Sequence, residues 1–205
     1  MLNLKEMLIG MPTRLRYVTR FSTCRVIKQE SVAEHCFFVA LYSLFIMWWC
    51  WDKNDEFLHT LNEYKILSRA LLHDLDEAAT GDVPRFFKYS DTALKQHLDE
   101  VAQKGVHQIA AKLWTDPTTI ASITDVWKNA KDNTSEGRIL AFADFLSVLS
   151  YSWEEVRQSN IIMKEHLTNM VEYYQRFTTK DFDFIRPLIE DARAILFEEI
   201  LTNGA

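Results

Sequence analysis

The chain has 205 residues, a length that suits one domain with a sizeable hydrophobic core. Hydrophobic residues make up 48% of it, whereas 5 glycines and 4 prolines are too few for the many turns of an all-β protein. The net charge of -6 excludes broad binding to a nucleic-acid polymer, because no surplus of cations is present to neutralise a phosphate backbone. A small anionic ligand held by a few local arginines is compatible with this charge.

Three cysteines, Cys24, Cys36 and Cys50, are odd in number and lack the CxxC spacing of a zinc knuckle. They predict reduced thiols in a cytoplasmic protein. The first residues lack the basic start and the cleavage site of a signal peptide. The apolar run 36–51 is shorter than the roughly 20 residues that a membrane span needs. We therefore expect a buried central helix and no membrane association.

Hydrophobic periodicity and capping residues predict only helices. Ser31 and Glu34 match a capping box, in which each side chain satisfies a backbone amide at a helix start. The segment 13–30 is basic, helical at first and then irregular, and 76–91 is a loop or a broken helix. No repeat or linker divides the chain, so we expect a single all-α domain over 1–205. The predicted helices cover residues 2–9, 31–51, 63–75, 92–114, 117–130, 135–158, 161–178 and 182–202.

Four polar residues interrupt this apolar pattern inside the predicted core helices. His35 lies one turn into an apolar helix, and Asp144 is flanked by apolar residues on every side of its helix. A buried, unpaired carboxylate is costly, so Asp144 needs a cation, several donors or a metal. The adjacent His73 and Asp74 end another apolar run. Because neighbours on a helix point about 100° apart, this pair converges on one ion most easily at a helix end.

Two imidazoles and two carboxylates suit a divalent metal ion, with positions left open for water and phosphate oxygens. Alone, His35 is more often a core histidine, and Asp144 is a structural carboxylate as often as a ligand. The set of four favours the metal. The candidate ions are Co, Mn, Zn, Fe and Mg.

Six short motifs surround and include these residues: Arg20-Phe21, Glu30-Ser-Val-Ala-Glu-His35, His73-Asp-Leu-Asp-Glu77, Thr80-Gly-Asp-Val-Pro84, Lys88-Tyr89 and Ala143-Asp144. The order of histidines and aspartates resembles the HD-domain metal-dependent phosphohydrolases. Over roughly residues 10–150, the whole set resembles the YfbR-like 5'-deoxynucleotidases, and phage-encoded dATP triphosphohydrolases of the DatZ type share much of it. The resemblance implies an HD-domain helical bundle.

The resemblance also implies a reaction, the hydrolysis of 2'-deoxynucleotides at the 5' phosphoester to a deoxynucleoside and phosphate. The implied metal ligands are His35, His73, Asp74 and Asp144. Glu77 would orient the attacking water or shuttle a proton, and general acid–base chemistry supports that role. Asp82 would hold the sugar or activate water.

The implied substrate contacts come from the same motifs. Arg20 would bind phosphate, where its planar fork suits two oxygens, and Lys88 is a second phosphate candidate. Phe21 stands where the family usually carries Trp, so it keeps an aromatic face but loses the indole N–H. Pro84 would pack against the sugar and exclude a 2'-hydroxyl.

Two alternatives stay open. The first is a triphosphohydrolase that releases triphosphate, which is favoured by the number of cations between Arg14 and Lys28. The second is a non-catalytic nucleotide-sensing or interaction domain, although Glu77 and Asp82 have no chemical use there. The binding partner is a small deoxynucleotide for both the 5'-deoxynucleotidase and the triphosphohydrolase.

The remaining polar and aromatic residues have simpler interpretations. Asp76 is expected to be a solvated turn residue, and His59, His97, His107 and His166 are expected on the surface. The aromatic stretch 48–51 and the apolar positions of the last two helices exceed what one small core requires. They predict the interface of a homo-oligomer.

Overall fold

The computed structural model describes residues 1–53 and 58–196, and this part of the chain contains helices and no β-strand. The predicted all-α fold is confirmed. The short 3-10 helices are η1 (Met11–Arg16), η2 (Leu58–Thr60), η3 (Gln175–Thr178) and η4 (Lys180–Ile185). The α-helices are α1 (Leu4–Ile9), α2 (Val32–Asp52), α3 (Glu63–Leu72), α4 (Glu77–Thr80), α5 (Arg85–Lys88), α6 (Thr92–Leu113), α7 (Pro117–Lys128), α8 (Ser135–Arg157), α9 (Ile161–Tyr174) and α10 (Arg186–Ala194).

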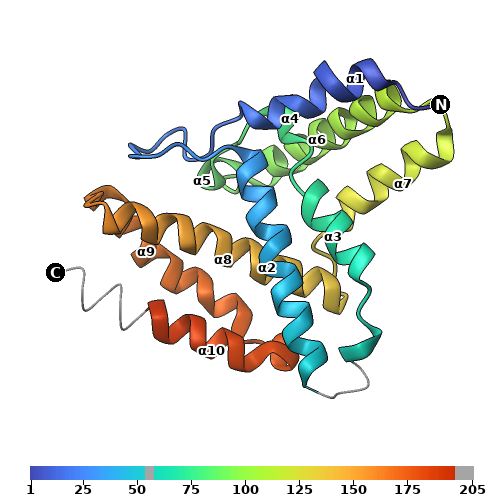
Figure 1. Ribbon diagram of the computed structural model, residues 1–205. Coiled ribbons are helices and arrows are strands. Elements are labelled where there is room, and N and C mark those ends of the chain that lie inside the picture. The colour runs from blue at the N-terminus through green and yellow to red at the C-terminus, as the bar shows by residue number, and fades with distance from the viewer. Residues whose placement is uncertain (54–57, 197–205) are drawn as a thin grey trace.

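Helix α2 stands at the centre of the fold, where it packs against α3 and α8 (Figure 1). Its start is the predicted capping box: the Glu34 N–H donates to Ser31 Oγ at 3.2 Å, and the Ser31 N–H donates to the Glu34 carboxylate at 2.8 Å. This cap fixes the first turn, so His35 faces the interior and is fully buried. Among the described helices, α2 is long and apolar enough to cross a membrane, a test that the core helix of a soluble protein also passes.

Two apolar cores lie on either side of the region where α3 ends. The larger core joins α2, α3, α8, α9 and α10, and its largest fully buried side chains include Phe142, Phe145 and Phe177. The smaller core forms under α4, α6 and α7 around Leu75 and Ile109. Burial of these side chains fixes the helices that carry the candidate polar residues.

Three predicted helices need correction. The helix predicted at 63–75 leaves α geometry after Leu72. The helix predicted at 161–178 turns to 3-10 geometry after Tyr174. The last helix, predicted at 182–202, begins as η4, and α10 follows only where Pro187 occupies a first-turn position that needs no N–H donor. Residues 197–202 lie outside the described part. The remaining predicted helices agree to within two residues at each end: 2–9, 31–51, 92–114, 117–130 and 135–158.

The segment 76–91 is a broken helix, as predicted. Helix α4 ends at Gly81, whose φ of 74° lies in the left-handed region that glycine adopts without strain. Pro84 then precedes α5. This break leaves Glu77 and Asp82 near Asp74, just after the end of α3.

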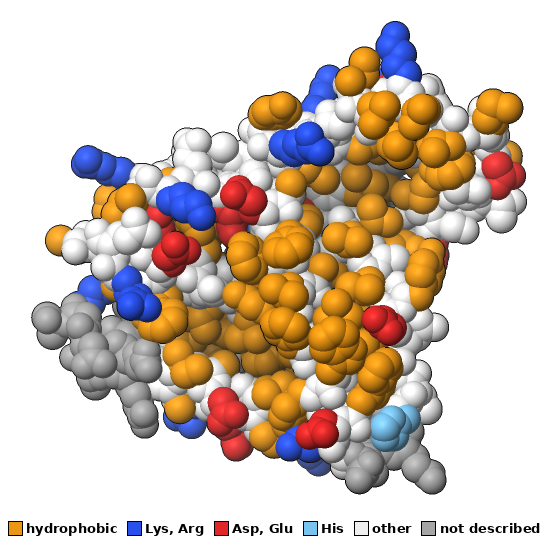
Figure 2. Space-filling model, viewed as in Figure 1, with side chains coloured by type: hydrophobic (Ala, Val, Ile, Leu, Met, Phe, Trp, Pro, Cys, Tyr) orange, Lys and Arg blue, Asp and Glu red, His pale blue; other side chains and the backbone are white. Residues whose placement is uncertain are grey.

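Exposed hydrophobic side chains gather on the face that contains α2 (Figure 2). On α2 they are Phe37, Phe38, Phe45 and Trp48. Trp49 and Trp51 instead pack against the larger core. The homo-oligomer stays a prediction, and sedimentation of a monomer at micromolar concentration would contradict it.

Candidate metal and active site

The site begins where the chain tightens at the end of α3. The Leu75 N–H donates to the Leu72 carbonyl at 3.0 Å, and the Glu77 N–H donates to the Asp74 carbonyl at 3.1 Å. These bonds span three residues instead of four, which changes the angle between neighbouring side chains. His73 Nε2 and Asp74 Oδ2 consequently lie 3.1 Å apart. The pair therefore converges at a helix end, as predicted.

Two further residues meet this pair from other helices. His35, from α2, has its Nε2 3.6 Å from Asp74 Oδ2 and 3.0 Å from Asp144 Oδ1, which comes from α8. The rings of His35 and His73 lie 5.4 Å apart between centroids. The structure thus brings together all four residues that the sequence singled out, and His35, His73 and Asp144 place ligand atoms within 4.8 Å of one another.

The hydrogen bonding of His73 shows which of its ring nitrogens is free to bind an ion. Its Nδ1 lies 2.8 Å from the Ala70 carbonyl oxygen, and a carbonyl only accepts, so Nδ1 carries the hydrogen. In the neutral ring, Nε2 then presents a lone pair to the Asp74 carboxylate. Both Nε2 atoms of the two histidines are buried and make no hydrogen bond to the described residues. A cation between the nitrogens and the carboxylates satisfies them all, so the residues fit a divalent metal ion.

The charges of the cluster are consistent with a bound cation. Burial opposes protonation of His73, but Asp74 outweighs it and raises the pKa of His73. Burial lowers the pKa of His35 to about 4, so this ring stays neutral.

Lys131 is a member of the site that the sequence did not single out. Its Nζ lies 2.6 Å from Asp144 Oδ2, so the other carboxylate oxygen is left facing His35. Burial opposes ionisation of Asp144, but Lys131 together with His35 and His73 outweighs it, so the pKa of Asp144 lies well below its usual range. Cys36 is also near: its sulfur lies 4.0 Å from His73 Nδ1, and Cys36, His73 and Asp74 place ligand atoms within 4.8 Å of one another.

Glu77 and Asp82 extend the acidic region beyond the four residues. Burial, reinforced by Asp74 and then Asp82, raises the pKa of Glu77 to about 10. Its Oε2 is buried without a hydrogen bond to any described group. Burial also raises the pKa of Asp82, and the charge of Arg20 and a hydrogen bond from the Phe21 N–H offset part of this rise. The Glu77 carboxyl is therefore able to hold a proton at neutral pH.

A cavity of about 740 Å³ opens beside the cluster. Asp144 lines it, together with four of the predicted substrate residues: Arg20, Phe21, Asp82 and Pro84. Lys88 is not among its lining residues and lies 4.0 Å from Asp99 instead. The volume falls within the usual range for small-molecule sites, about 300–1,000 Å³.

The predicted basic segment contributes one cation to this cavity. Arg20 lines it, with one guanidinium nitrogen buried and without a hydrogen bond to the described residues. Arg14, Arg16 and Arg25 are exposed and do not line it. In the sequence, the number of cations between residues 14 and 28 favoured a longer phosphate. The structure removes this argument, because only Arg20 among these arginines lines the cavity.

Phe21 forms a wall of the cavity in an unusual backbone conformation. Its φ of 54° is uncommon for a residue other than glycine, and such strain is often found at functional sites. The ring stacks on Tyr151 at 5.0 Å and meets the edge of His166 at 5.2 Å.

The surface prediction for His166 is wrong. The side chain is half-buried, lines the cavity, and its Nδ1 lies 3.1 Å from Ser152 Oγ. Its spacing of three and four residues from Met163 and Met170 places it on the apolar face of α9, a signal that the sequence contained.

Asp76 also differs from its prediction as a solvated residue. It is half-buried and accepts a hydrogen bond of 2.8 Å from the indole N–H of Trp127. Trp127 belongs to α7, which packs against the smaller core. Asp76 therefore ties the segment after α3 to that core, away from the histidines.

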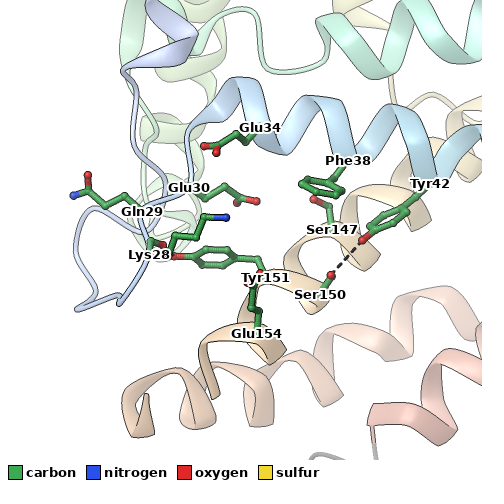
Figure 3. A pocket seen from close by; sticks show the side chains of 10 residues that line it. All are labelled: Lys28, Gln29, Glu30, Glu34, Phe38, Tyr42, Ser147, Ser150, Tyr151 and Glu154. Carbon is green, nitrogen blue, oxygen red and sulfur yellow. Dashed lines mark hydrogen bonds between the residues drawn. The ribbon is translucent and has the colours of Figure 1, made fainter. Parts of the chain in front are cut away.

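A second, smaller cavity of about 80 Å³ lies behind the cluster between α2 and α8 (Figure 3). Ser147 lines it and places its hydroxyl 3.0 Å from His35 Nδ1. Glu30 lines it as well, and its Oε2 lies 3.7 Å from the Arg20 guanidinium. The backbone N–H of Arg20 donates a hydrogen bond of 2.9 Å to the Glu30 carbonyl, which holds the two residues together. Glu30 is thus a buried partner of the cavity arginine that the sequence did not predict.

The Glu30 carboxyl is expected to make stability fall as pH rises. Burial raises its pKa from 4.5 to about 7 despite Arg20, so the folded protein binds this proton more tightly than the unfolded chain. The free energy of unfolding therefore falls between about pH 4.5 and 7, by roughly 3 kcal/mol from this group alone. Glu30→Gln removes the ionisation, so its unfolding free energy, measured by urea denaturation of metal-free protein, is expected to vary less over this window.

Glu34→Gln is the matched control, because the hydrogen bonds from Ser31 lower the pKa of Glu34 instead. Its carboxylate stabilises the fold above the unfolded pKa, so the cost of this substitution grows with pH, opposite in sign to Glu30→Gln. Parallel stability curves for Glu30→Gln and the wild type would contradict the assignment.

Comparison with known proteins decides the family. The model of the family described as 5'-deoxynucleotidase YfbR-like matches residues 8–188. The chain belongs to this family. It is therefore an enzyme of the HD phosphohydrolase type, as the motifs predicted, and the family is metal-dependent.

The individual relatives are distant. A 5'-deoxynucleotidase of Erwinia tasmaniensis is 26% identical over 151 residues, covering 72% of each chain. One from Pasteurella multocida is 32% identical over 102 residues, covering 49% of this chain and 50% of the relative. The crystal structure of an HD-domain phosphohydrolase from Listeria innocua has a TM-score of 0.67 at 25% identity and covers 97% of this chain and 98% of that one. A Pyrococcus horikoshii protein, at 16% identity, shares the fold with a TM-score of 0.72, covering 92% of this chain and 97% of its own.

Proposed function

We propose that this YfbR-like chain is a metal-dependent 5'-deoxynucleotidase, which converts a 2'-deoxynucleoside monophosphate and water to the deoxynucleoside and phosphate. The observation that carries the proposal is the convergence of His35, His73, Asp74 and Asp144 beside a cavity lined by Arg20. Imidazole nitrogens that face carboxylates suit a divalent ion, and a guanidinium with unused donors suits a phosphate.

In this proposal the four converging residues hold one divalent ion, drawn from Co, Mn, Zn, Fe and Mg. When bound, the ion supplies a Lewis acid at the phosphate. Lys131 keeps one Asp144 oxygen directed at the cluster, and Ala70 keeps His73 in the tautomer whose Nε2 is free to bind. Arg20 binds the phosphate oxygens on the cavity side.

The reaction requires one proton to reach the leaving group. The oxygen of water bonds to phosphorus, the bond from phosphorus to O5' breaks, and O5' takes a proton as the deoxynucleoside leaves. Glu77, whose pKa burial raises, delivers that proton and recovers one from the attacking water. Asp82, on the cavity wall, holds the sugar or aligns the attacking water.

The nucleoside lies between Phe21 and Pro84 in this arrangement. Both residues line the cavity, and both lack a polar side-chain atom that could satisfy a 2'-hydroxyl. An unsatisfied hydroxyl at such a wall costs about 1–3 kcal/mol. The proposal therefore includes a preference for deoxyribose over ribose.

A panel of dAMP, AMP and dATP with Mn, Co or Mg tests the proposal, with products separated by chromatography. We expect metal-dependent release of deoxyadenosine and phosphate from dAMP, and slower release of adenosine from AMP. Equal rates on AMP and dAMP would contradict the sugar preference. Tight binding of dAMP without turnover would instead support the nucleotide-sensing alternative.

A further inference from the structure

A histidine of α9 presents one ring nitrogen to the large cavity. His166 lines this cavity and is half-buried. Its Nδ1 lies 3.1 Å from the Oγ of Ser152, a fully buried residue of α8. Its Nε2 makes no hydrogen bond to residues 1–53 and 58–196, and the buried side-chain atoms without a partner in these ranges do not include it. Nε2 is therefore accessible from the space that His166 lines.

Ser152 decides which nitrogen of His166 carries the hydrogen. A buried hydroxyl needs an acceptor for its hydrogen. Among the described residues, the Ser152 hydroxyl has one hydrogen-bond partner, His166 Nδ1, so the hydroxyl donates and Nδ1 accepts. Burial, and then the charge of Arg20, lower the pKa of His166, so the ring is neutral at pH 7. The remaining ring hydrogen lies on Nε2, and the cavity receives an N–H donor.

Helix α8 relates this donor to the metal-binding residues. Asp144, Val148 and Ser152 follow one another at intervals of four residues, so they share one face of α8. At 1.5 Å per residue, Ser152 lies roughly 12 Å along the helix from Asp144. Val148 lies between them and lines the cavity. A ligand with its phosphate at Asp144 can therefore extend past an apolar side chain toward His166.

The segment before α2 gives the same order of groups. The Arg20 guanidinium lies 5.6 Å from the centre of the Phe21 ring, and that centre lies 5.2 Å from the centre of the His166 ring. Asn169, three residues after His166 on α9, also lines the cavity, and its amide makes no hydrogen bond within the described part of the chain. The cavity thus has a cation near the metal-binding residues and two neutral hydrogen-bonding side chains farther along.

We propose that the Nε2–H of His166 and the side-chain amide of Asn169 bind the edge of the nucleobase, with Ser152 as the positioning residue for His166. The inference rests on the proposed function, because it assumes that the phosphate lies at the metal-binding residues and Arg20. The bases present ring nitrogens or carbonyl oxygens that accept an N–H, and an amide both donates and accepts. Both side chains are uncharged, which suits a neutral base better than a second phosphate.

His166→Phe and Asn169→Ala test the inference, with kcat/KM measured on dAMP and on 2-deoxyribose 5-phosphate, which lacks the base. A base acceptor left without its donor corresponds to roughly a five- to a hundredfold loss. We expect such a loss on dAMP in each variant and an unchanged kcat/KM on 2-deoxyribose 5-phosphate. His166→Gln keeps an N–H donor and is expected to recover part of the rate. His107→Phe is the matched control, because His107 is exposed on α6 and does not line the cavity.

The role of Ser152 has a spectroscopic test. The ring-nitrogen NMR chemical shifts of His166, assigned by their loss in His166→Phe, report which nitrogen carries the hydrogen. We expect the hydrogen on Nε2 in the wild type and a mixture of the two neutral tautomers in Ser152→Ala. A hydrogen on Nδ1 in the wild type would overturn the assignment of Nε2 as the donor.

Failure of the inference is distinguishable from failure of the proposed function. If the wild type hydrolyses dAMP but the variants lose equally on dAMP and on 2-deoxyribose 5-phosphate, or lose nothing on dAMP, the inference falls and the proposed function stands. Calorimetry with deoxyadenosine makes the comparison without turnover. Weaker binding to both variants supports the inference even if dAMP is not hydrolysed, whereas equal binding, or no binding to the wild type, overturns it. Melting temperatures of the variants confirm that each one folds.

Discussion

Replacing Asp74 with alanine is expected to remove the bound divalent ion and to lower the rate of dAMP hydrolysis by more than about a hundredfold. Asp74 Oδ2 lies 3.1 Å from His73 Nε2 and 3.6 Å from His35 Nε2, so this one carboxylate faces both buried imidazoles. Without Asp74, an ion between the two rings has Asp144 as its remaining carboxylate ligand. One oxygen of Asp144 is already bound to Lys131. The measurement is the metal content after dialysis, by mass spectrometry, together with kcat.

Asp76→Asn is the matched control for this experiment. Asp76 lies two positions along the same turn, is half-buried, and binds Trp127 instead of facing the histidines. Asparagine keeps an oxygen that accepts the indole N–H, so we expect this variant to retain both its ion and its rate. Full metal occupancy in Asp74→Ala would contradict the assignment of Asp74 as a ligand.

Replacing Glu77 with glutamine is expected to keep the ion but lower kcat by about 10²- to 10⁴-fold. Burial, Asp74 and Asp82 raise the pKa of Glu77 to about 10, so the wild-type carboxyl carries a proton at neutral pH. Glutamine has nearly the same shape but has no acidic proton to give to the leaving O5'. Metal content and KM for dAMP are measured beside kcat, because a proton-transfer role changes kcat alone.

Two outcomes would contradict this role. Loss of the ion together with the rate would make Glu77 a residue that supports the metal cluster. An unchanged kcat would show that another group, or water, protonates O5'. Glu77→Asp separates these outcomes further, because the shorter side chain retains an acidic proton but holds it farther from the leaving O5'.

Local signals explain why much of the fold was predictable. Ser31 and Glu34 form their capping box through contacts within one turn, so the sequence is enough to locate the start of α2. His35, His73 and Asp144 were found because a polar residue inside an apolar helix needs a partner, wherever that partner lies. These arguments require no knowledge of how the helices pack.

The residues that were missed depend on contacts between distant segments. Lys131 lies in a polar stretch before α8, and only the folded loop brings its Nζ to Asp144. Glu30 is buried because an isolated bridge between Thr19 and Ser31 lays the basic segment beside it. Arg85 and Tyr173 meet across the cavity although 88 positions separate them in the chain. No local pattern marks such pairs, since an exposed arginine and a paired one have the same sequence neighbours.

The most direct test of the account is an anomalous diffraction map from crystals grown with Mn or Co. The account predicts one strong peak, bounded by His35, His73, Asp74 and Asp144, that disappears in crystals of Asp74→Ala. A peak elsewhere, or an ordered wild-type site without any peak at saturating metal, would contradict the claim that these residues form the metal centre.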